Sequence, residues 1–435
     1  MNNIIHFLST SLIFVLLSSC GNTQETDLIK KIEVYELPSD LTTITDENLS
    51  PILKSLGDAK IIGVTECVHD MIEPFHFRNA LIKKLVEENK IGVIAIESGL
   101  PESRLCYDYI LGKDIPIDSV LTDGFSCIFG SLEPNRELLM WLRKYNHDKP
   151  SSEQVHFYGF DIPGCAPNPV LENTKAGFNY VLDYLDDVDK EKSGIFRQAI
   201  KEYEIYLRIR DNAQDTLPHF WDLDSAGWNN IVSILDGIEN TFKENSDVYI
   251  KNSSDLDYKW AFRSIYNARQ NVIFLRSIGK PDIGYDIRDL GQFKNIQWIM
   301  ENEPDKRILL FAHSTHLMKE IHSENPKVIP YTRCGEYLAN EYGKDYKVIG
   351  NFFRKLEWFD GDPLELGEGY LGYELSKLGP NNFLVEVSSL DKKWMKEWCI
   401  RESNSGDKLL THLEEAVDII YFNDIQTTLF PPENK

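Results

Sequence analysis

The 435-residue sequence lacks the short motifs of three common enzyme classes. It contains no G-x-S-x-G, the turn that presents the catalytic serine of α/β-hydrolases. It contains no H-E-x-x-H, the pair of zinc ligands found on one helix in many metalloproteases. Its seven cysteines form no C-x-x-C pair, so neither a zinc ribbon nor a thioredoxin-type redox motif is indicated.

Positive charge is also scarce. The chain has 46 Lys and Arg against 69 Asp and Glu, which gives a formal net charge of −23. Phosphate backbones and anionic bilayers attract proteins through clustered cationic side chains. We therefore expect no nucleic-acid partner and no basic membrane-binding patch. A hydrophobic content of 42% indicates a folded, globular chain.

Long apolar runs are missing except near the N-terminus. Phe7 to Leu17 is uncharged but too short to cross a bilayer, which is typical of the core of a signal peptide. The run ends in Leu17-Ser18-Ser19-Cys20, which resembles the lipobox of bacterial lipoproteins. We expect a bacterial cell-envelope protein, held on a membrane through acylated Cys20. The predicted parts are a signal peptide at 1–19, a lipid-anchored tether at 20–28 and a folded domain at 29–435.

The clearest structural signal is a βαβ pattern between residues 59 and 99. An apolar run at 61–64, a helical spacing of apolar residues and a second apolar run at 91–96 follow one another. Such crossovers build parallel sheets. Further strands are predicted at 155–160, 307–312, 346–352 and 383–387. We predict an α/β fold with a mostly parallel central sheet flanked by helices, and an α-helical insertion at about 173–280.

Titratable side chains stand at the ends of four predicted strands. They are Glu66 with His69, Glu97, Asp161, and His313 with His316. Because the carboxyl ends of parallel strands meet at one edge of a sheet, we expect these groups to share a site. An imidazole beside a carboxylate can take a proton from water, and further His or Arg side chains can stabilise an oxyanion. The pattern is typical of hydrolysis by an activated water.

Two other mechanisms stay open from the residues alone. Cys67 lies two residues from His69 and could act as a thiolate nucleophile, although a small core residue is the simpler interpretation. Glu66, His69, His313 and His316 could also ligate zinc, since H-x-x-H is an acceptable ligand spacing.

Taken together, these motifs resemble those of the erythromycin esterase family, bacterial enzymes whose named members hydrolyse a macrolide lactone ring. The family's first motif, G-E-x-x-H-G, and the residues that follow it are matched by Glu66, His69, Glu73, Arg78 and Glu97. Its G-x-D strand, R-D helix and A-H-N-x-H motif are similar to Phe157 to Asp161, Arg288-Asp289 and Ala312 to His316. The matches run in the family's order from about residue 60 to 320.

The resemblance implies a site and a substrate class. His69 is then the general base, and Glu66, Glu97, His313 and Arg78 are the other catalytic residues. The residues assigned to substrate binding are His316, Glu73, Asp161 and Arg288. The resemblance implies neither a metal nor another cofactor. The expected substrate is a small-molecule ester or lactone, with a macrolide, and hence antibiotic resistance, as one case.

The chain departs from the family pattern at three positions. Thr65 and Asp70 replace the two glycines of the first motif, and Ser314 replaces the asparagine of the last. Two alternative functions remain at this point. One is a metal-dependent envelope hydrolase, and the other is a non-catalytic envelope binding protein on the same fold.

Overall fold

The computed structural model describes residues 32–126, 129–162, 170–207, 216–219, 222–277, 281–324, 330–357, 362–401 and 408–428. The predicted signal peptide and tether lie outside these residues, so both stay predictions. None of the helices in the described ranges combines the length and the apolar composition needed to cross a membrane.

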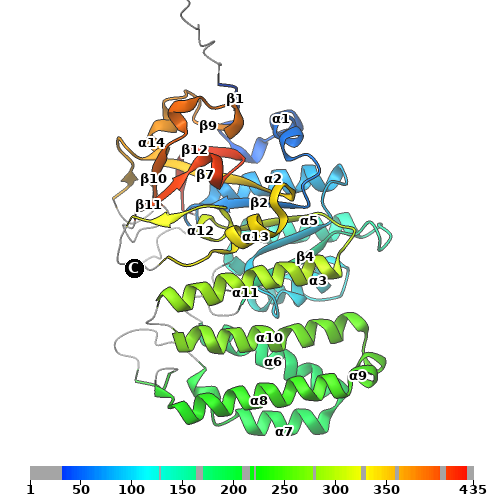
Figure 1. Cartoon of the computed structure of the whole chain (residues 1–435). Coiled ribbons are helices and arrows are strands. Elements are labelled where there is room, and N and C mark those ends of the chain that lie inside the picture. Colours follow the sequence, from blue (N-terminus) through cyan, green and yellow to red (C-terminus); the bar gives the residue numbers. More distant parts are fainter. Residues whose placement is uncertain are drawn as a thin grey trace, which may run out of the picture. The chain divides into compact units, whose positions relative to one another are not determined.

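A nine-stranded sheet lies at the centre of the domain (Figure 1). Across the sheet, the strands are β1 (Val34–Glu36), β9 (Asn382–Glu386), β12 (Ile419–Thr427), β7 (Tyr346–Glu357), β2 (Ile61–Glu66), β5 (Ile308–His313), β3 (Val93–Gly99) and β4 (His156–Asp161), with β8 (Leu364–Glu365) paired to β7. The six strands from β12 to β4 are parallel to one another, and β1, β9 and β8 pair antiparallel. The predicted fold class is confirmed.

Helices on both faces explain why the parallel strands are continuously apolar. Every residue of β2 and β3 is buried. Ile62 and Ile94 pack with the helices α1 (Asp46–Leu56), α2 (Ile72–Glu87) and α5 (Glu133–Asn146). Their neighbours Ile61 and Val93 point to the opposite face, which is covered by α11 (Pro281–Asn302) and α13 (Cys334–Tyr342). A strand with two covered faces has no position for a solvated side chain, except at its ends.

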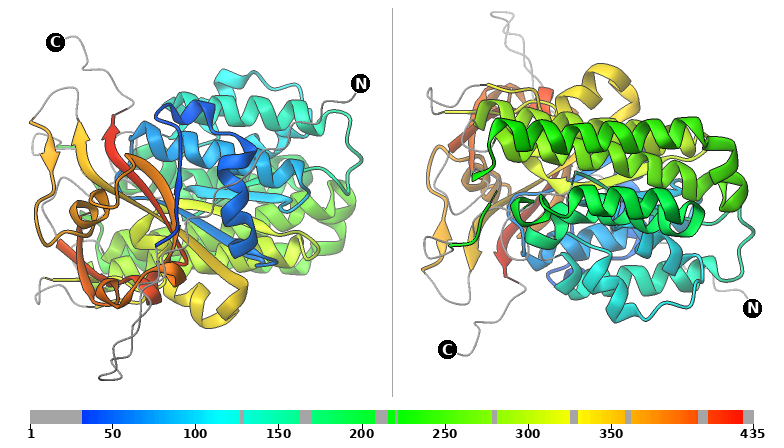
Figure 2. Two further views of the ribbon diagram at one scale, coloured as in Figure 1. Left: turned by 90° about the horizontal axis from the view of Figure 1, so that it is seen from above. Right: turned by 90° about the horizontal axis from the view of Figure 1, so that it is seen from below.

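Among the described residues, five α-helices lie between β4 and α11 in the sequence and form a layer beyond α11 (Figures 1 and 2). They are α6 (Val170–Val188), α7 (Lys190–Ile200), α8 (Ser225–Glu244), α9 (Ser246–Asn252) and α10 (Asp255–Ser277). Helix α10 contacts both α6 and α11. The layer has its own hydrophobic core, in which Phe178, Trp228 and Phe242 are buried. Aromatic residues of this segment therefore pack as core, as amphipathic helices require.

The remaining elements connect these layers or lie beside them. The short helices are α3 (Arg104–Ile110), α4 (Ile117–Asp123), α12 (Ser314–Leu317), α14 (Leu371–Ser376) and α15 (Leu413–Ala416), and a small antiparallel sheet consists of β10 (Glu397–Arg401), β11 (Lys408–His412) and β6 (His322–Ser323).

Candidate active site

The carboxyl ends of four neighbouring strands bring the predicted residues to one edge of the sheet. Glu66 is the last residue of β2 and lies opposite His313, the last residue of β5. Asp161 ends β4 and pairs with Gly99 of β3. The register between β3 and β4 shifts after Ile96, and Glu97 is the next residue along β3. A parallel sheet thus gathers groups that are far apart in the sequence.

The Glu66 carboxylate orients His69. Its Oε1 accepts a hydrogen bond from Nδ1 of His69 at 2.8 Å, which leaves Nε2 as the nitrogen that can accept a proton. Glu66 is fully buried, whereas 42% of the His69 side chain is exposed. The rings of His69 and Phe129 are nearly perpendicular with centroids 5.8 Å apart, and the ring centroids of His69 and His313 are 5.0 Å apart.

The pair shifts the titration of both partners. Burial alone would lower the pKa of His69, but the Glu66 carboxylate, together with Glu97 and Asp70, outweighs burial and raises this pKa to about 9. Burial raises the pKa of Glu66 above its usual value, although His69 opposes that shift. The proton between Nδ1 and Oε1 is therefore strongly held, and the imidazolium of His69 is stabilised.

Glu97 is the centre of a second charged group. Its Oε1 accepts a hydrogen bond from Nη2 of Arg288 at 2.8 Å and lies 3.4 Å from Nε2 of His316. Its Oε2 accepts a hydrogen bond from the backbone N–H of His313 at 2.8 Å. Burial alone would raise the pKa of Glu97, but His316, His69 and Arg288 together hold it well below the usual range. Glu97 is therefore a permanent carboxylate.

Arg288 joins β3 to β4. Its guanidinium binds Glu97 and also donates to both oxygens of Asp161, with Nε at 3.2 and 3.1 Å from them. Gln292 and Asn295, one and two turns further along α11, bind Asp161 Oδ1 and the carbonyl of Phe160. Burial would lower the pKa of Arg288, but the two carboxylates outweigh it and raise this pKa. Arg288 stays charged although it is largely buried.

His316 lies between two carboxylates. Its Nδ1 is 2.8 Å from Oδ1 of Asp289, and its Nε2 faces Glu97. Burial would lower the pKa of His316, but Asp289 and Glu97 raise it to about 10. His316 is therefore an imidazolium at neutral pH. Sequence reasoning assigns no role to Asp289, and its position next to Arg288 in the R-D motif is the only sequence signal for it.

His313 is neutral and already uses both ring nitrogens. Its Nε2 is 2.8 Å from the backbone oxygen of Cys67, so this nitrogen carries the proton. Its Nδ1 then accepts from the hydroxyl of Thr315 at 2.7 Å. Burial and the positive charge of His69 lower the pKa of His313 to about 3. In this arrangement the hydrogen bond from His313 to Cys67 links β5 to the loop after β2.

Glu73 and Arg78 bind elsewhere. Both carboxylate oxygens of Glu73 accept hydrogen bonds from Thr427 of β12, at 2.8 and 2.9 Å. Arg78 is fully buried in α2 and donates to the side-chain oxygens of Asn79 and Asn135. Burial lowers its pKa to about 9, and the Glu66 carboxylate opposes that shift. Arg78 thus influences Glu66 through its charge, whereas the contacts of Glu73 lie with β12.

The three departures from the family pattern each have a structural counterpart. Asp70 has a φ of 73°, in the left-handed region that glycine occupies most easily, which explains why a glycine is usual there. The hydroxyl of Thr65 accepts a hydrogen bond from the backbone of Asn351 in β7. The hydroxyl of Ser314 donates to the backbone oxygen of Glu66.

The structure also describes the surroundings of the residues on which the two alternative mechanisms depend. Cys67 is buried, and its thiol donates to the backbone oxygen of Asn351 at 2.7 Å. Within the described ranges, no three His, Cys, Asp or Glu side chains are arranged to hold a metal ion.

The fold and the cluster define an α/β protein with a histidine–carboxylate centre at the carboxyl edge of a parallel sheet. The chain belongs to the erythromycin esterase family, because the model for "Erythromycin esterase" matches residues 86–403. This match includes Glu97, Asp161, Arg288, His313 and His316 and begins after Glu66, His69 and Arg78. Membership of the family implies a hydrolase.

Individual relatives are distant. The chain is 23% identical to erythromycin esterase type II of Escherichia coli in an alignment of length 319 that covers 70% of this chain and 71% of the relative. It is 22% identical to the putative hydrolase YbfO of Bacillus subtilis (strain 168) in an alignment of length 334 that covers 73% of this chain and 70% of the relative.

Solved structures share the fold. A crystal structure of a Bacillus cereus protein is similar with a TM-score of 0.72 and 18% identity, covering 91% of this chain and 95% of that one. A mutant of the erythromycin esterase EreC in its open conformation is similar with a TM-score of 0.66 and 16% identity, covering 89% and 96%. At these identities the likeness concerns the fold.

Proposed function

We propose that the protein hydrolyses a carboxylic ester or lactone with a water molecule that is activated by His69. The observation that supports this proposal is the Glu66–His69 pair. Its hydrogen bond of 2.8 Å holds the proton on Nδ1 and leaves the lone pair of Nε2 on an accessible ring. A positioned imidazole of this kind contributes about 10²- to 10⁴-fold to proton transfer.

In the proposed reaction, His69 moves one proton twice. The water oxygen bonds to the carbonyl carbon while a water proton passes to Nε2, and Glu66 stabilises the imidazolium. The intermediate then collapses, the acyl–oxygen bond breaks, and the proton passes from Nε2 to the leaving alkoxide. The products are an acid and an alcohol, which stay joined in one molecule when the substrate is a lactone. Arg288 and His316 supply positive charge at the same strand edge for the developing oxyanion.

The substrate class is proposed from the relatives. Erythromycin esterase type II and EreC carry the name of a macrolide substrate, so a macrolide lactone is one candidate. A simpler ester is the other.

The pH dependence of catalysis tests the role of the pair. Because the pKa of His69 is raised to about 9, the neutral imidazole becomes abundant only as the pH rises through that value. We expect kcat/KM to increase about tenfold per pH unit below pH 9 and to level off above it. In Glu66→Gln the main carboxylate that raises this pKa is gone while burial remains, so the inflection should fall well below that of the wild type.

Glu73→Gln is the matched control for this pH profile. Glu73 follows the same loop in the sequence, but its carboxylate binds Thr427. The inflection should therefore stay near that of the wild type. The same inflection in Glu66→Gln and the wild type would contradict the assignment of His69 as the base.

We also propose that the protein is anchored in a bacterial envelope through Cys20, on the sequence alone. The lipobox-like Leu17 to Cys20 and the preceding apolar run support this proposal. In cells fed an alkyne-labelled fatty acid, the wild type should be labelled and should partition into detergent, and Cys20→Ser should lose both properties. Cys399→Ser, a change of a half-buried cysteine in β10, is the control that should keep the label. A labelled Cys20→Ser would refute the anchor.

A further inference from the structure

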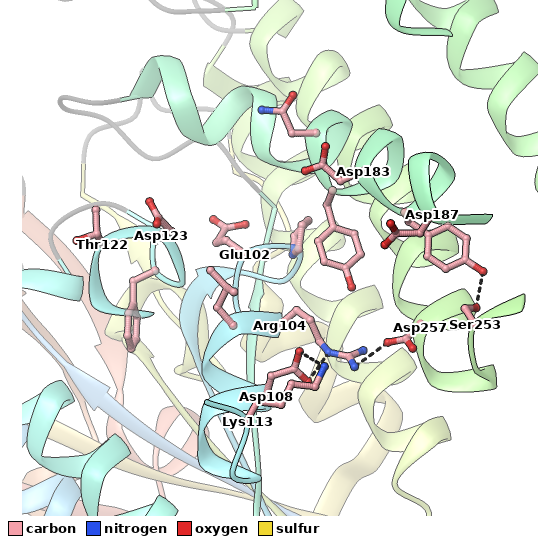
Figure 3. Close-up of a pocket in the computed structure, with 16 residues that line it drawn as sticks. Glu102, Arg104, Asp108, Lys113, Thr122, Asp123, Asp183, Asp187, Ser253 and Asp257 are labelled. Carbon is pink, nitrogen blue, oxygen red and sulfur yellow. Dashed lines mark hydrogen bonds and ion pairs between the residues drawn. The ribbon is translucent and has the colours of Figure 1, made fainter. Parts of the chain in front are cut away.

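An acidic cavity of about 750 Å³ is lined by none of the residues that take part in the proposed reaction (Figure 3). Its walls come from α3 and the end of α4 on one side and from α6 and the start of α10 on the other. Figure 3 shows Asp123 on one side, Asp183 and Asp187 on the other, and Glu102 and Arg104 between them.

Negative charge remains on this cavity after the ion pairs are formed. Its two basic residues are already neutralised: Arg104 binds Asp108 and Asp257, and Lys113 also binds Asp108. Asp183 pairs with Arg197, which is not part of the lining. Asp123 and Asp187 line the cavity without a cationic partner anywhere in the described residues.

Glu102 adds a buried carboxyl group to the same wall. Only 9% of this residue is exposed. One carboxylate oxygen accepts from the hydroxyl of Ser126, and the other, Oε2, has no hydrogen-bond partner in the part of the chain that the structure describes. A buried carboxyl oxygen without a donor is costly in a folded protein, and a positive charge in the cavity would offset part of that cost through space.

Two tyrosines make the cavity suitable for an organic cation. Tyr180 and Tyr184 of α6 line it next to the carboxylates, and Tyr184 is held by a hydrogen bond to Ser253. Aromatic faces attract ammonium groups, whereas a small metal ion needs several oxygens at one point. The carboxylates here surround a wide space, and among the described residues none of them belongs to a group of three suited to a metal.

The cavity and the candidate active site share structural supports. Ser126, which binds Glu102, also accepts from the backbone N–H of Gly99, two residues after Glu97 in β3. Phe125 lines the cavity, and Phe129, four residues later, contacts the ring of His69. A ligand in the cavity would therefore touch segments that also support the catalytic cluster.

We propose that this cavity binds the positively charged amine or quaternary ammonium group of a small organic molecule. The group lies between Asp123 and Asp187, against Tyr180 and Tyr184, with Glu102 behind it. Two sources share this chemistry: the cation belongs either to a free ligand or to the hydrolysed substrate itself. The second case rests on the proposed function, whereas the first does not.

Choline and its uncharged isostere 3,3-dimethyl-1-butanol test the proposal directly. The two molecules have the same shape and differ in charge. Titration calorimetry of the full-length protein should give a dissociation constant at least about tenfold lower for choline. In Asp123→Asn/Asp187→Asn, the constant for choline should rise at least about fivefold, and that for the alcohol should stay the same.

Asp186→Asn is the matched control for the double variant. Asp186 is the neighbour of Asp187 on α6, is not part of the lining and pairs with Arg197. Its substitution should leave choline binding unchanged, and circular dichroism checks the fold of each variant. Equal affinities for choline and the alcohol in the wild type would overturn the proposal, as would unchanged choline binding in the double variant.

A pair of esters separates the two sources. Butyrylcholine is the butyrate ester of choline, and 3,3-dimethylbutyl butyrate is the butyrate ester of 3,3-dimethyl-1-butanol. A lower KM for the charged ester, lost in Asp123→Asn/Asp187→Asn, places the cation on the substrate. Equal KM values together with choline binding make the cation a separate ligand. Choline binding without hydrolysis of either ester, or of any other ester or lactone, keeps the cavity proposal and refutes only the proposed function.

Discussion

His69→Ala is expected to lower kcat/KM for ester or lactone hydrolysis by about 10²- to 10⁴-fold, while the protein stays folded. The His69 side chain is 42% exposed, so its removal leaves no large cavity in the core. What is lost is the group that accepts the proton of the attacking water. The rate should be measured by mass spectrometry in H₂¹⁸O on a panel of macrolide lactones and simple esters. Hydrolysis of an ester or lactone at its acyl–oxygen bond places one ¹⁸O in the acid product.

His147→Ala is the matched control for His69→Ala. His147 also faces a carboxylate with its Nδ1, at 2.8 Å from Asp148, but its side chain is 79% exposed at the end of α5. This variant should keep the wild-type rate. Turnover of His69→Ala at the wild-type rate would refute His69 as the base. A wild type that hydrolyses nothing on the panel would favour the non-catalytic binding protein.

Arg288→Met is expected to lower the free energy of unfolding at pH 7 by about 3–5 kcal/mol. The substitution leaves the buried carboxylates of Glu97 and Asp161 without the guanidinium that binds both. The cost is that of an uncompensated buried charge, which exceeds the loss of a hydrogen bond. Urea unfolding followed by circular dichroism measures it. Arg288 is one of the groups that hold the pKa of Glu97 low, so in the variant Glu97 takes up a proton more readily and the loss should shrink as the pH falls.

Arg197→Met is the control for charge removal at the surface. Arg197 also binds two carboxylates, those of Asp183 and Asp186, but its side chain is 38% exposed. Exposed ion pairs contribute about 0–1 kcal/mol, so this variant should lose no more than that. If Arg288→Met lowers the free energy of unfolding by no more than Arg197→Met does, water must solvate the charges of Glu97 and Asp161, and the prediction is wrong.

Five of the six parallel strands, all except β12, were predictable from the sequence. The predicted strands at 155–160 and 307–312 differ by one residue from β4 and β5. Strands covered on both faces must be apolar throughout, so their limits are marked by the first polar residues. This is also why Glu66, Asp161 and His313 could be assigned to one edge before any contact was known.

Other elements left weaker signals. β12 lies inside the sheet between β9 and β7 but was not predicted, because its apolar run at 419–422 is followed by Asn423 and Asp424. Those two side chains bind Asn382 and Arg354, which are distant in the sequence. Polar residues inside a strand are acceptable only with such partners, and a single sequence does not reveal them.

The sequence by itself determined that histidines and carboxylates end neighbouring parallel strands, because the pattern of apolar runs dictates where each strand stops. Only the tertiary structure decided the charge of each group. Of three histidines at one edge, His313 is neutral and His316 is an imidazolium, and His69 is paired with Glu66. The energy between charges depends on distances of a few ångströms and on burial, and neither is encoded in local spacing.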